Sequence, residues 1–247
     1  MSIENEGELD ALKRVGRIVR MALERMQKAV RPGVTTAELD RIGAAVLKEH
    51  GARSAPKLVY GFPADILVSV NDEAVHGIPG PRRLAAGDLV KLDVTAEKGG
   101  YMADAAVTVA VGPAPEERRR LVAAARAAFE RAMEVARAGN RVCDIGRAVE
   151  GEVARRGFAV LRDLSGHGIG RTIHEAPTVP NWYDRTLRTP LTEGMVITVE
   201  PLVAERSTAS YEDRDGWTIR TKGGDLSAHH EHTLVITRGR PILLTAA

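Results

Sequence analysis

Several features that would narrow the class of this protein are scarce in its sequence. The 247 residues include a single cysteine, Cys143, so no disulfide can form within the chain. Residues 1–6 have neither the basic flank nor the apolar run of a signal peptide, and no apolar segment approaches the roughly 20 residues of a membrane span. We therefore expect a protein of the reducing cytoplasm that does not enter a membrane.

The sequence also lacks an excess of charge of either sign. Its 35 lysines and arginines nearly balance 33 aspartates and glutamates, which leaves a net charge of +2. This balance gives no electrostatic reason to expect DNA or a lipid surface as the main partner. The run Arg118–Arg120 is a local exception that would allow contact with ribosomal RNA, although a solvated first turn of a helix explains it more simply. We expect a monomer.

An internal repeat organises the chain. Residues 22–51 and 128–157 align without a gap at an offset of 106, which is too long for a solenoid repeat and fits a duplication. No long linker rich in serine, glycine or proline separates the copies. We therefore predict one domain over residues 1–247, with half-repeats at 9–112 and 113–240. Helix pairs followed by strands in both copies predict an α+β fold with pseudo-two-fold symmetry.

Periodicity and helix-ending residues define the predicted elements. In the first copy, apolar residues along one face predict a helix from Leu9 to about Val30, which Pro32 and Gly33 end. Thr35, with a glutamate three residues later, predicts a capping box for a second helix. The second copy repeats this plan. The predicted segments are helices at 9–30, 35–51, 115–138 and 143–157 and strands at 66–70, 89–95, 101–111, 195–203, 217–221 and 232–236.

Carboxylates occupy strand positions where a core residue would be expected. Asp93 and Glu200 each come six residues after a glycine that precedes an apolar run. Asp93 and Asp104 also flank a glycine-rich turn, and a hairpin centred on Lys98-Gly99 would bring their Cβ atoms to roughly 4.5–5.5 Å of each other. Two bare carboxylates at that distance repel, so they must share a proton or hold a cation.

Two further acids favour the cation. Glu200 and Glu231 have their midpoint at Asp215-Gly216, a typical hairpin dipeptide, but the intervening segment is too long to predict that they pair. His229 alternates with Glu231 on one strand face, but we do not expect it to be a ligand. Oxygen donors with some imidazole suit divalent Co, Mn, Fe, Zn or Ni, and the residue types do not select among these metals.

Three histidines have local surroundings that suggest a site. His167 lies between two glycines, whose missing side chains let backbones approach closely and aim the imidazole at a metal. His76 and His174 precede proline-stopped turns at comparable places in the two copies. His174 and the glutamate after it do not begin a zinc-protease helix, because Pro177 interrupts the turn that would carry the second histidine.

These motifs in combination resemble those of type I methionine aminopeptidases. The resemblance covers nearly the whole chain, and the motifs are specific as a set. It implies the pita-bread (creatinase/aminopeptidase) fold, an internally duplicated α+β fold with pseudo-two-fold symmetry. The matching segments are 71–79, the hairpin from Asp93 to Asp104, 166–171, 174–177, 199–201 and 231–233.

The resemblance implies a dinuclear metal centre. Asp93 would hold one metal ion, and Asp104 with Glu231 would bridge both ions. His167 and Glu200 would complete the second position. Water between two such cations has its pKa lowered from about 15.7 toward about 7, which makes it a nucleophile toward the carbonyl of an N-terminal methionine.

The resemblance also implies roles for residues around the metals. Glu200 would be the proton shuttle. His76 and His174 would be catalytic, since they would contact the substrate amide and stabilise the tetrahedral intermediate. Aromatic side chains would bind the substrate methionine: Phe62, Trp217 and Tyr60.

The implied enzyme removes the initiator methionine from nascent proteins and peptides when the second residue is small. One alternative is a proline-specific relative such as prolidase or aminopeptidase P, which usually carries a further N-terminal domain, for which the short lead before Leu9 leaves no room. Another is a binding module that has lost catalysis, but such a protein should lack ligands, and none is missing. The sequence departs from the family at five positions, which would alter the shape of the pocket: Leu67, Val75, Met102, Ile173 and His229.

Overall fold

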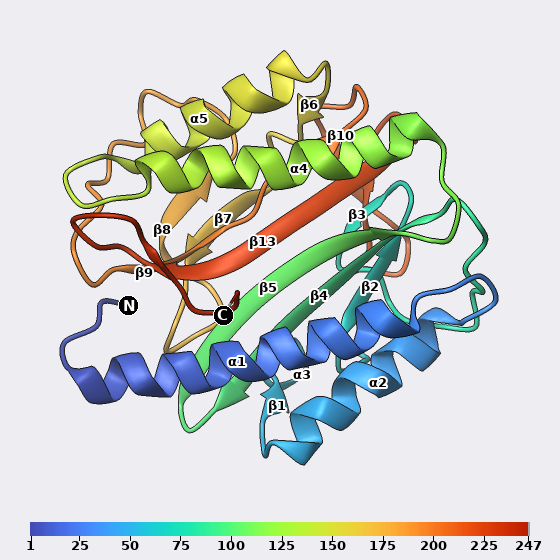
Figure 1. Cartoon of the computed structure of the whole chain (residues 1–247), viewed down its shortest axis with the longest axis horizontal. Coiled ribbons are helices and arrows are strands. Elements are labelled where there is room, and N and C mark those ends of the chain that lie inside the picture. The colour runs from blue at the N-terminus through green and yellow to red at the C-terminus, as the bar shows by residue number, and fades with distance from the viewer. Residues whose placement is uncertain (247) are drawn as a thin grey trace.

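A computed structural model describes residues 1–246 of the protein. The fold is built around one large sheet (Figure 1). Within those residues the sheet has eleven strands, in the main order β1-β4-β5-β13-β9-β7-β8, with β2, β6, β10 and β14 joined at its sides. A second sheet has the order β11-β12-β3. The antiparallel pairing of β5 with β13 joins strands from the two halves of the chain, so the first sheet runs across both.

The element bounds follow the predicted repeat. The first half of the chain contains α1 (Glu6–Ala29), α2 (Thr36–Glu49), β1 (Arg53–Ser54), α3 (Ala55–Tyr60), β2 (Leu67–Val70), β3 (Glu73–Val75), β4 (Leu89–Lys98) and β5 (Tyr101–Ala110). The second half contains α4 (Glu116–Val135), α5 (Val142–Arg155), β6 (Ala159–Val160), β7 (Ser165–Gly168), β8 (Glu175–Pro180), β9 (Val196–Val199), β10 (Leu202–Ala204), β11 (Ser210–Glu212), β12 (Ile219–Thr221), β13 (Ser227–Val235) and β14 (Ile242–Leu243).

The helices confirm the duplication inferred from the sequence. An offset of 106 relates α2 to α5 at both ends and relates the last residue of α1 to that of α4. The predicted capping box of α2 is present: Thr35 Oγ1 accepts a hydrogen bond from the Glu38 N–H at 3.1 Å, and the Glu38 carboxylate accepts one from the Thr35 N–H at 2.7 Å. No helix within residues 1–246 combines the length and apolar character needed to cross a bilayer.

Strand alternation separates the helix-covered core from the other face of the sheet. Figure 1 shows α1 and α4 lying along the central strands, with α2 and α5 outside them. In β4, Leu92 and Val94 join the core beneath α1, so Asp93 between them projects to the opposite face. In β13, the two histidines that flank Glu231 pack against α4, and Glu231 projects away from the helix. The carboxylates therefore gather on the face that α1 and α4 leave uncovered.

The first hairpin differs from its predicted register. Lys98 pairs with Tyr101, so the turn is centred on the two following glycines, with φ values of 62° and 81°, and not on Lys98-Gly99. A two-residue hairpin turn of this kind needs positive φ at both central positions, which suits glycine and would strain a lysine. Asp104 consequently faces Thr95, and the prediction that it lies directly opposite Asp93 is wrong. The two aspartates are diagonal neighbours on the same face.

The second half contains a longer and more broken hairpin. The predicted strand 195–203 is divided into β9 and β10 at Glu200 and Pro201, because proline cannot donate to a strand ladder. β9 and β10 both pair with β13 in one register, which sets Glu200 opposite Glu231. The same register runs through β11 and β12 to a turn around Asp215-Gly216. β13 begins at Ser227, five residues before the predicted start, and so contains Glu231.

Candidate functional site

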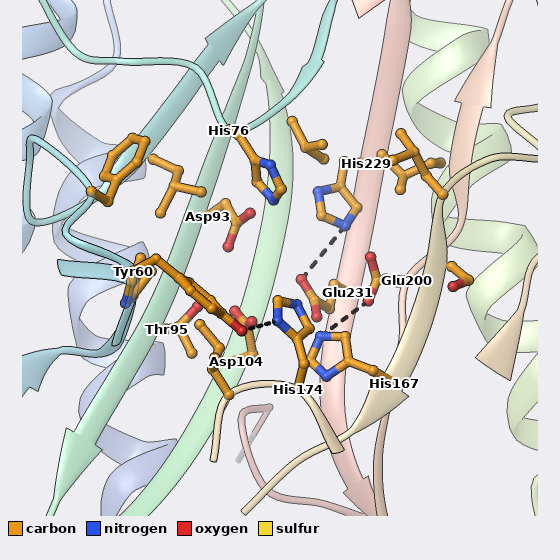
Figure 2. Close-up of a pocket in the computed structure, with 18 of the residues that line it drawn as sticks. Tyr60, His76, Asp93, Thr95, Asp104, His167, His174, Glu200, His229 and Glu231 are labelled. Atoms are coloured by element: carbon orange, nitrogen blue, oxygen red, sulfur yellow. Dashed lines mark hydrogen bonds and ion pairs between the residues drawn. The ribbon is translucent and has the colours of Figure 1, made fainter. Parts of the chain in front are cut away.

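One cavity of about 270 Å³ lies on the uncovered face of the main sheet. Every residue that the sequence predicted for catalysis, metal binding or substrate binding lines it, and Figure 2 shows most of their side chains directed toward a common centre. These residues come from both halves of the chain and are Tyr60, Phe62, His76, Asp93, Asp104, His167, His174, Glu200, Trp217 and Glu231.

Four of these side chains form a buried carboxylate cluster. Asp93, Asp104 and Glu231 project from β4, β5 and β13, and Glu200 directly follows β9. Burial raises the pKa of Asp104 to about 6. Burial also raises the pKa of the other three carboxyls well above their usual range, and the charge of Asp104 adds to this in each. Such a cluster is costly in its charged form unless a cation lies among the oxygens.

The donor atoms fit a divalent metal. Asp104, His167 and Glu231 each offer one ligand atom, and these atoms lie within 4.8 Å of one another. Asp93, His229 and Glu231 form a second such set, so Glu231 is shared. Among the described residues, one oxygen each of Asp93 and Asp104 is buried with no hydrogen-bond partner. Burial lowers the pKa of His167 to about 4, which keeps its imidazole neutral and able to donate a lone pair.

Sequence reasoning missed several residues of the site. His229 lines the cavity, as its two-residue alternation with Glu231 indicated, although no role was predicted for it from the sequence. Thr198 was also missed: its hydroxyl donates to Glu200 Oε1 at 2.9 Å and accepts from the His167 N–H at 3.0 Å. Across the sheet, Thr233 and the backbone of Asp104 exchange two hydrogen bonds of 2.8 Å. Both threonines stand two residues from a predicted ligand.

Glycines let His167 approach its neighbours, as predicted. A Cβ atom at Gly168 would lie 2.1 Å from the carbonyl oxygen of Ala176 in β8, and one at Gly166 would lie 2.7 Å from the carbonyl oxygen of Thr198. Both distances are too short for real Cβ contacts. The strand that carries His167 is therefore held between two backbones.

We expect Gly168→Ala to separate β7 from β8. Overpacking of this kind destabilises by about 1–3 kcal/mol, and it should also weaken metal binding because His167 is the adjacent residue. Urea unfolding measures the first effect and competition with a chelator the second. Gly151→Ala is the matched control, since Gly151 is exposed in α5 with nothing within 4 Å of its added Cβ, and it should leave stability unchanged or raise it. Equal stability of both variants would refute the close approach.

His174 and His76 both line the cavity, but they differ in their backbone positions and in their neighbours. His174 lies between β7 and β8; the Tyr60 hydroxyl is 2.6 Å from its Nδ1, and its ring centroid is 4.2 Å from that of His167. His76 follows β3 with φ of 58°, and burial lowers its pKa to about 4. Two predictions are wrong here. His76 follows β3 whereas His174 precedes β8, so the two histidines do not occupy comparable places in the two copies. Pro177 lies within β8 after a cis peptide bond and not in a turn.

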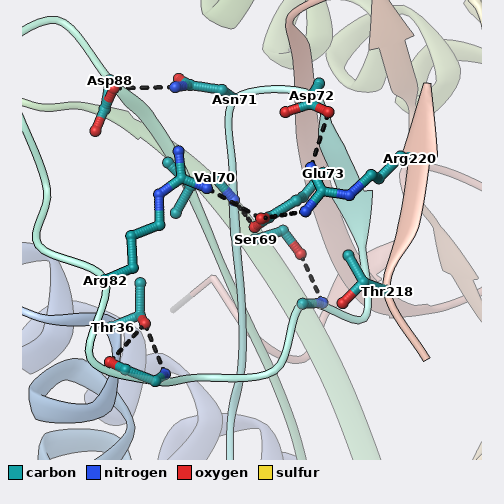
Figure 3. A network of polar contacts seen from close by, with 12 residues as sticks. Thr36, Ser69, Val70, Asn71, Asp72, Glu73, Arg82, Asp88, Thr218 and Arg220 are labelled. Carbon is teal, nitrogen blue, oxygen red and sulfur yellow. Dashed lines mark hydrogen bonds and ion pairs between the residues drawn. The ribbon is translucent and has the colours of Figure 1, made fainter. Parts of the chain in front are cut away.

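A polar network holds the segment that precedes His76 (Figure 3). The carboxylate of Glu73 accepts from Arg82 and from Arg220, each at 3.0 Å. Arg220 also pairs with Asp72 at 2.8 Å. Because Arg220 belongs to β12, which pairs with β3, the second half of the chain helps to position a histidine of the first half.

The cavity also has an apolar wall. Phe62 is 2% exposed and meets Trp217 edge to face, with ring centroids 5.2 Å apart. Of the positions that depart from the resembled family, Leu67 packs with Phe62 and Trp217. Val75 and Ile173 also line the cavity, and His229 lines it near the acids. Met102 is not among the residues that line the cavity, although it packs in the same apolar cluster as Ile173.

The arginine run has contacts within its own chain. Arg118 donates to the Gly87 carbonyl oxygen at 2.5 Å, Arg119 donates to the Ala114 carbonyl oxygen at 2.9 Å, and Arg120 lies over the Phe158 ring at 5.9 Å. These contacts at the start of α4 favour the interpretation as a helix turn. Ribosome contact stays a prediction, which co-sedimentation of a variant with all three arginines changed to glutamate would test.

Comparisons with known proteins agree with this geometry. A model of metallopeptidase family M24 matches residues 10–238. The chain is 44% identical to methionine aminopeptidase 2 of Bacillus subtilis (strain 168), over 99% of each chain. It superposes on the crystal structure of methionine aminopeptidase from Thermotoga maritima with a TM-score of 0.96 and 34% identity, covering 100% of both chains. Prolidase from Pyrococcus furiosus has a TM-score of 0.79 at 24% identity, over 99% of this chain and 65% of that one. The predicted pita-bread α+β fold is confirmed.

Proposed function

Because the chain belongs to metallopeptidase family M24, we propose that it is a metal-dependent methionine aminopeptidase. It hydrolyses the bond after the N-terminal methionine of nascent proteins and peptides whose second residue is small. The observation that carries this proposal is a single cavity in which buried carboxylates and histidines adjoin an aromatic wall. The full-length likeness to methionine aminopeptidases supports the same activity.

We propose that two divalent ions bind in the cavity. The buried acids support this, because two of their oxygens lack partners and all four have raised pKa values. When bound, such ions lower the pKa of water toward about 7 and polarise a carbonyl oxygen. The donor set fits Co, Mn, Fe, Zn and Ni alike. The proposed ligands are Asp93, Asp104, His167, Glu200 and Glu231.

Glu200 is the proton shuttle in this proposal. Burial raises the pKa of its carboxyl, and the Thr198 hydroxyl holds one of its oxygens at 2.9 Å. A carboxylate with a raised pKa takes a proton from the attacking water readily. The oxygen that does not accept from Thr198 takes this proton and then delivers it to the nitrogen of the leaving amine.

His174 and His76 bind the amide that is cleaved. The contact with the Tyr60 hydroxyl occupies Nδ1 of His174, which leaves Nε2 to donate to the carbonyl oxygen as negative charge develops there. Burial lowers the pKa of both histidines, so each is neutral near pH 7 and donates from one nitrogen only. His76 contacts the amide from the opposite half of the chain.

The aromatic wall selects the substrate side chain. Phe62 and Trp217 present ring edges and faces, and thioethers make favourable contacts with such rings. Tyr60 is 47% exposed, so it lies at the mouth of the cavity, where the rest of the peptide leaves. We propose that the protein acts as a monomer, since both halves of the cavity come from the same chain. We also propose that it acts in the cytoplasm.

A peptide panel tests the proposed function. The metal-loaded protein is incubated with Met-Ala-Ser, Met-Lys-Ser and an Xaa-Pro peptide, and free methionine is measured under each of the five metals. We expect methionine release from Met-Ala-Ser, much less from Met-Lys-Ser and no cleavage before proline. Cleavage of the Xaa-Pro peptide without methionine release would instead support a proline-specific peptidase. Absence of turnover under every metal would support a binding module.

We expect His174→Ala to lower kcat about 100-fold with little change in KM. The substitution removes a donor that acts mainly as charge develops on the carbonyl oxygen. Tyr60→Phe is the graded control, because it removes only the hydroxyl that orients His174 and should cost less. Steady-state kinetics on Met-Ala-Ser measure both. A rise in KM without a fall in kcat would show that His174 only binds the substrate.

A further inference from the structure

His229 is a buried imidazole whose nitrogens bond to nothing in the part of the chain that the structure describes. Its side chain is 2% exposed, and neither Nδ1 nor Nε2 has a hydrogen-bond partner within residues 1–246. Burying a polar group without a partner costs free energy, and native proteins seldom do it without a function. A packing role alone would be served better by an apolar side chain.

The backbone holds His229 firmly in this position. It pairs with Leu202 across β10, and the Thr108 hydroxyl accepts from its N–H at 2.7 Å and donates to its carbonyl oxygen at 2.8 Å. The strand face it occupies is the face of Glu231, two residues later. Strand alternation therefore places the His229 side chain on the face that lines the cavity.

The groups that His229 faces are metal-binding oxygens. Nε2 is 3.5 Å from Glu231 Oε2, too far for a good hydrogen bond, and Figure 2 shows the two side chains directed toward one another. A ligand atom of Asp93 lies within 4.8 Å of both. Asp93 also has a buried oxygen without a partner among the described residues. Two acids and an imidazole thus surround one point, and Asp93 and His229 each bring buried atoms without a hydrogen-bond partner among the described residues.

We propose that His229 binds a divalent metal ion together with Asp93 and Glu231. This inference rests on the proposed metal centre and adds a ligand to it. The set Asp104, His167 and Glu231 already offers one imidazole. With His229, each of the two proposed metal positions would have a nitrogen donor, and Glu231 belongs to both ligand sets.

The added nitrogen changes which metals the first position favours. Imidazole suits Fe, Ni and Zn, whereas all-oxygen sites suit Mn and Mg. The position at Asp93 should therefore hold Zn²⁺ in clear preference to Mn²⁺. Removal of the imidazole should reduce that preference.

Zinc X-ray absorption of the full-length protein tests the proposal, because imidazole ligands scatter in a characteristic pattern. With two Zn²⁺ bound, we expect two imidazoles per protein in the wild type and one in His229→Gln. Chelator competition should show that the variant binds one of its two Zn²⁺ ions at least about tenfold more weakly, with a smaller loss for Mn²⁺. His50→Gln, which removes a histidine outside the cavity, should match the wild type in both measurements.

Each outcome decides between supporting and rejecting the role of His229. One imidazole in the wild type overturns it, and so does an unchanged count in a folded His229 variant. Circular dichroism checks folding, and His229→Asn replaces the glutamine variant if the latter does not fold. Failure of the wild type to bind any metal would refute the proposed metal centre itself. Two bound Zn²⁺ with one imidazole would refute only the assignment of His229.

Discussion

Asp104→Asn is expected to lower kcat/KM at least about 10³-fold and to remove tight binding of metal. Asp104 is 6% exposed and offers an oxygen to the ligand set with His167 and Glu231. The amide has nearly the same shape, so the cavity keeps its form, but it carries no charge and is a weak ligand. A loss of 10³-fold corresponds to about 4 kcal/mol of transition-state stabilisation.

The control for this substitution is Asp65→Asn. Asp65 forms an ion pair with Lys57 at 3.1 Å on the surface, and such pairs contribute little. Its activity and metal content should therefore equal those of the wild type. Metal analysis after dialysis and kinetics on Met-Ala-Ser measure both variants. Full activity of Asp104→Asn would contradict the ligand role of Asp104 and the proposed mechanism with it.

The same substitution is expected to stabilise the protein once metal is removed, by an amount that grows between about pH 4 and about pH 6. Burial raises the pKa of Asp104 from 3.8 to about 6, so between these values the folded state binds more protons than the unfolded state. Stability from this group is present below about pH 4 and is lost as pH rises through about 6. At about 1.4 kcal/mol per pKa unit, the metal-free wild type should lose about 3 kcal/mol that Asp104→Asn does not lose.

Urea unfolding of both proteins in the presence of a chelator measures this difference. Buried histidines such as His230 have lowered pKa values and destabilise the fold as pH falls, but they are common to both proteins and cancel in the comparison. The difference in unfolding free energy should therefore grow in favour of the variant from about pH 4 to about pH 6 and stay constant up to about pH 7.5. Added Zn²⁺ should reverse the order. A difference that does not change with pH would contradict the raised pKa of Asp104.

The helical framework was predictable because its signals are local. Apolar spacing along α1, the capping box at Thr35 and Glu38, and the glycines that follow the helices act within a few residues. The duplication was predictable for the same reason, since α2 and α5 repeat at the offset seen in the sequence. The identity of most site residues also followed from strands that carry acids where apolar residues would normally pack.

Register was harder to predict because it depends on turns and on distant pairing. For Asp93 and Asp104 the correct turn lies one residue later than the symmetric guess, and that shift changes a facing pair into a diagonal one. For Glu200 and Glu231 the simple midpoint was right. Sequence could not establish it, because the chain between them divides into short strands, two of which join a different sheet with β3.

The sequence by itself determined the duplicated helix plan, the α+β class and the set of acids and histidines that the cavity collects. Only the tertiary structure decided which of them share a ligand set, and it brought His229 beside Asp93. The physical reason is the pairing of β5 with β13, which joins side chains more than 100 residues apart on one face of the sheet. Helix periodicity is a short-range property, whereas the distance between donor atoms depends on how two separately packed halves meet.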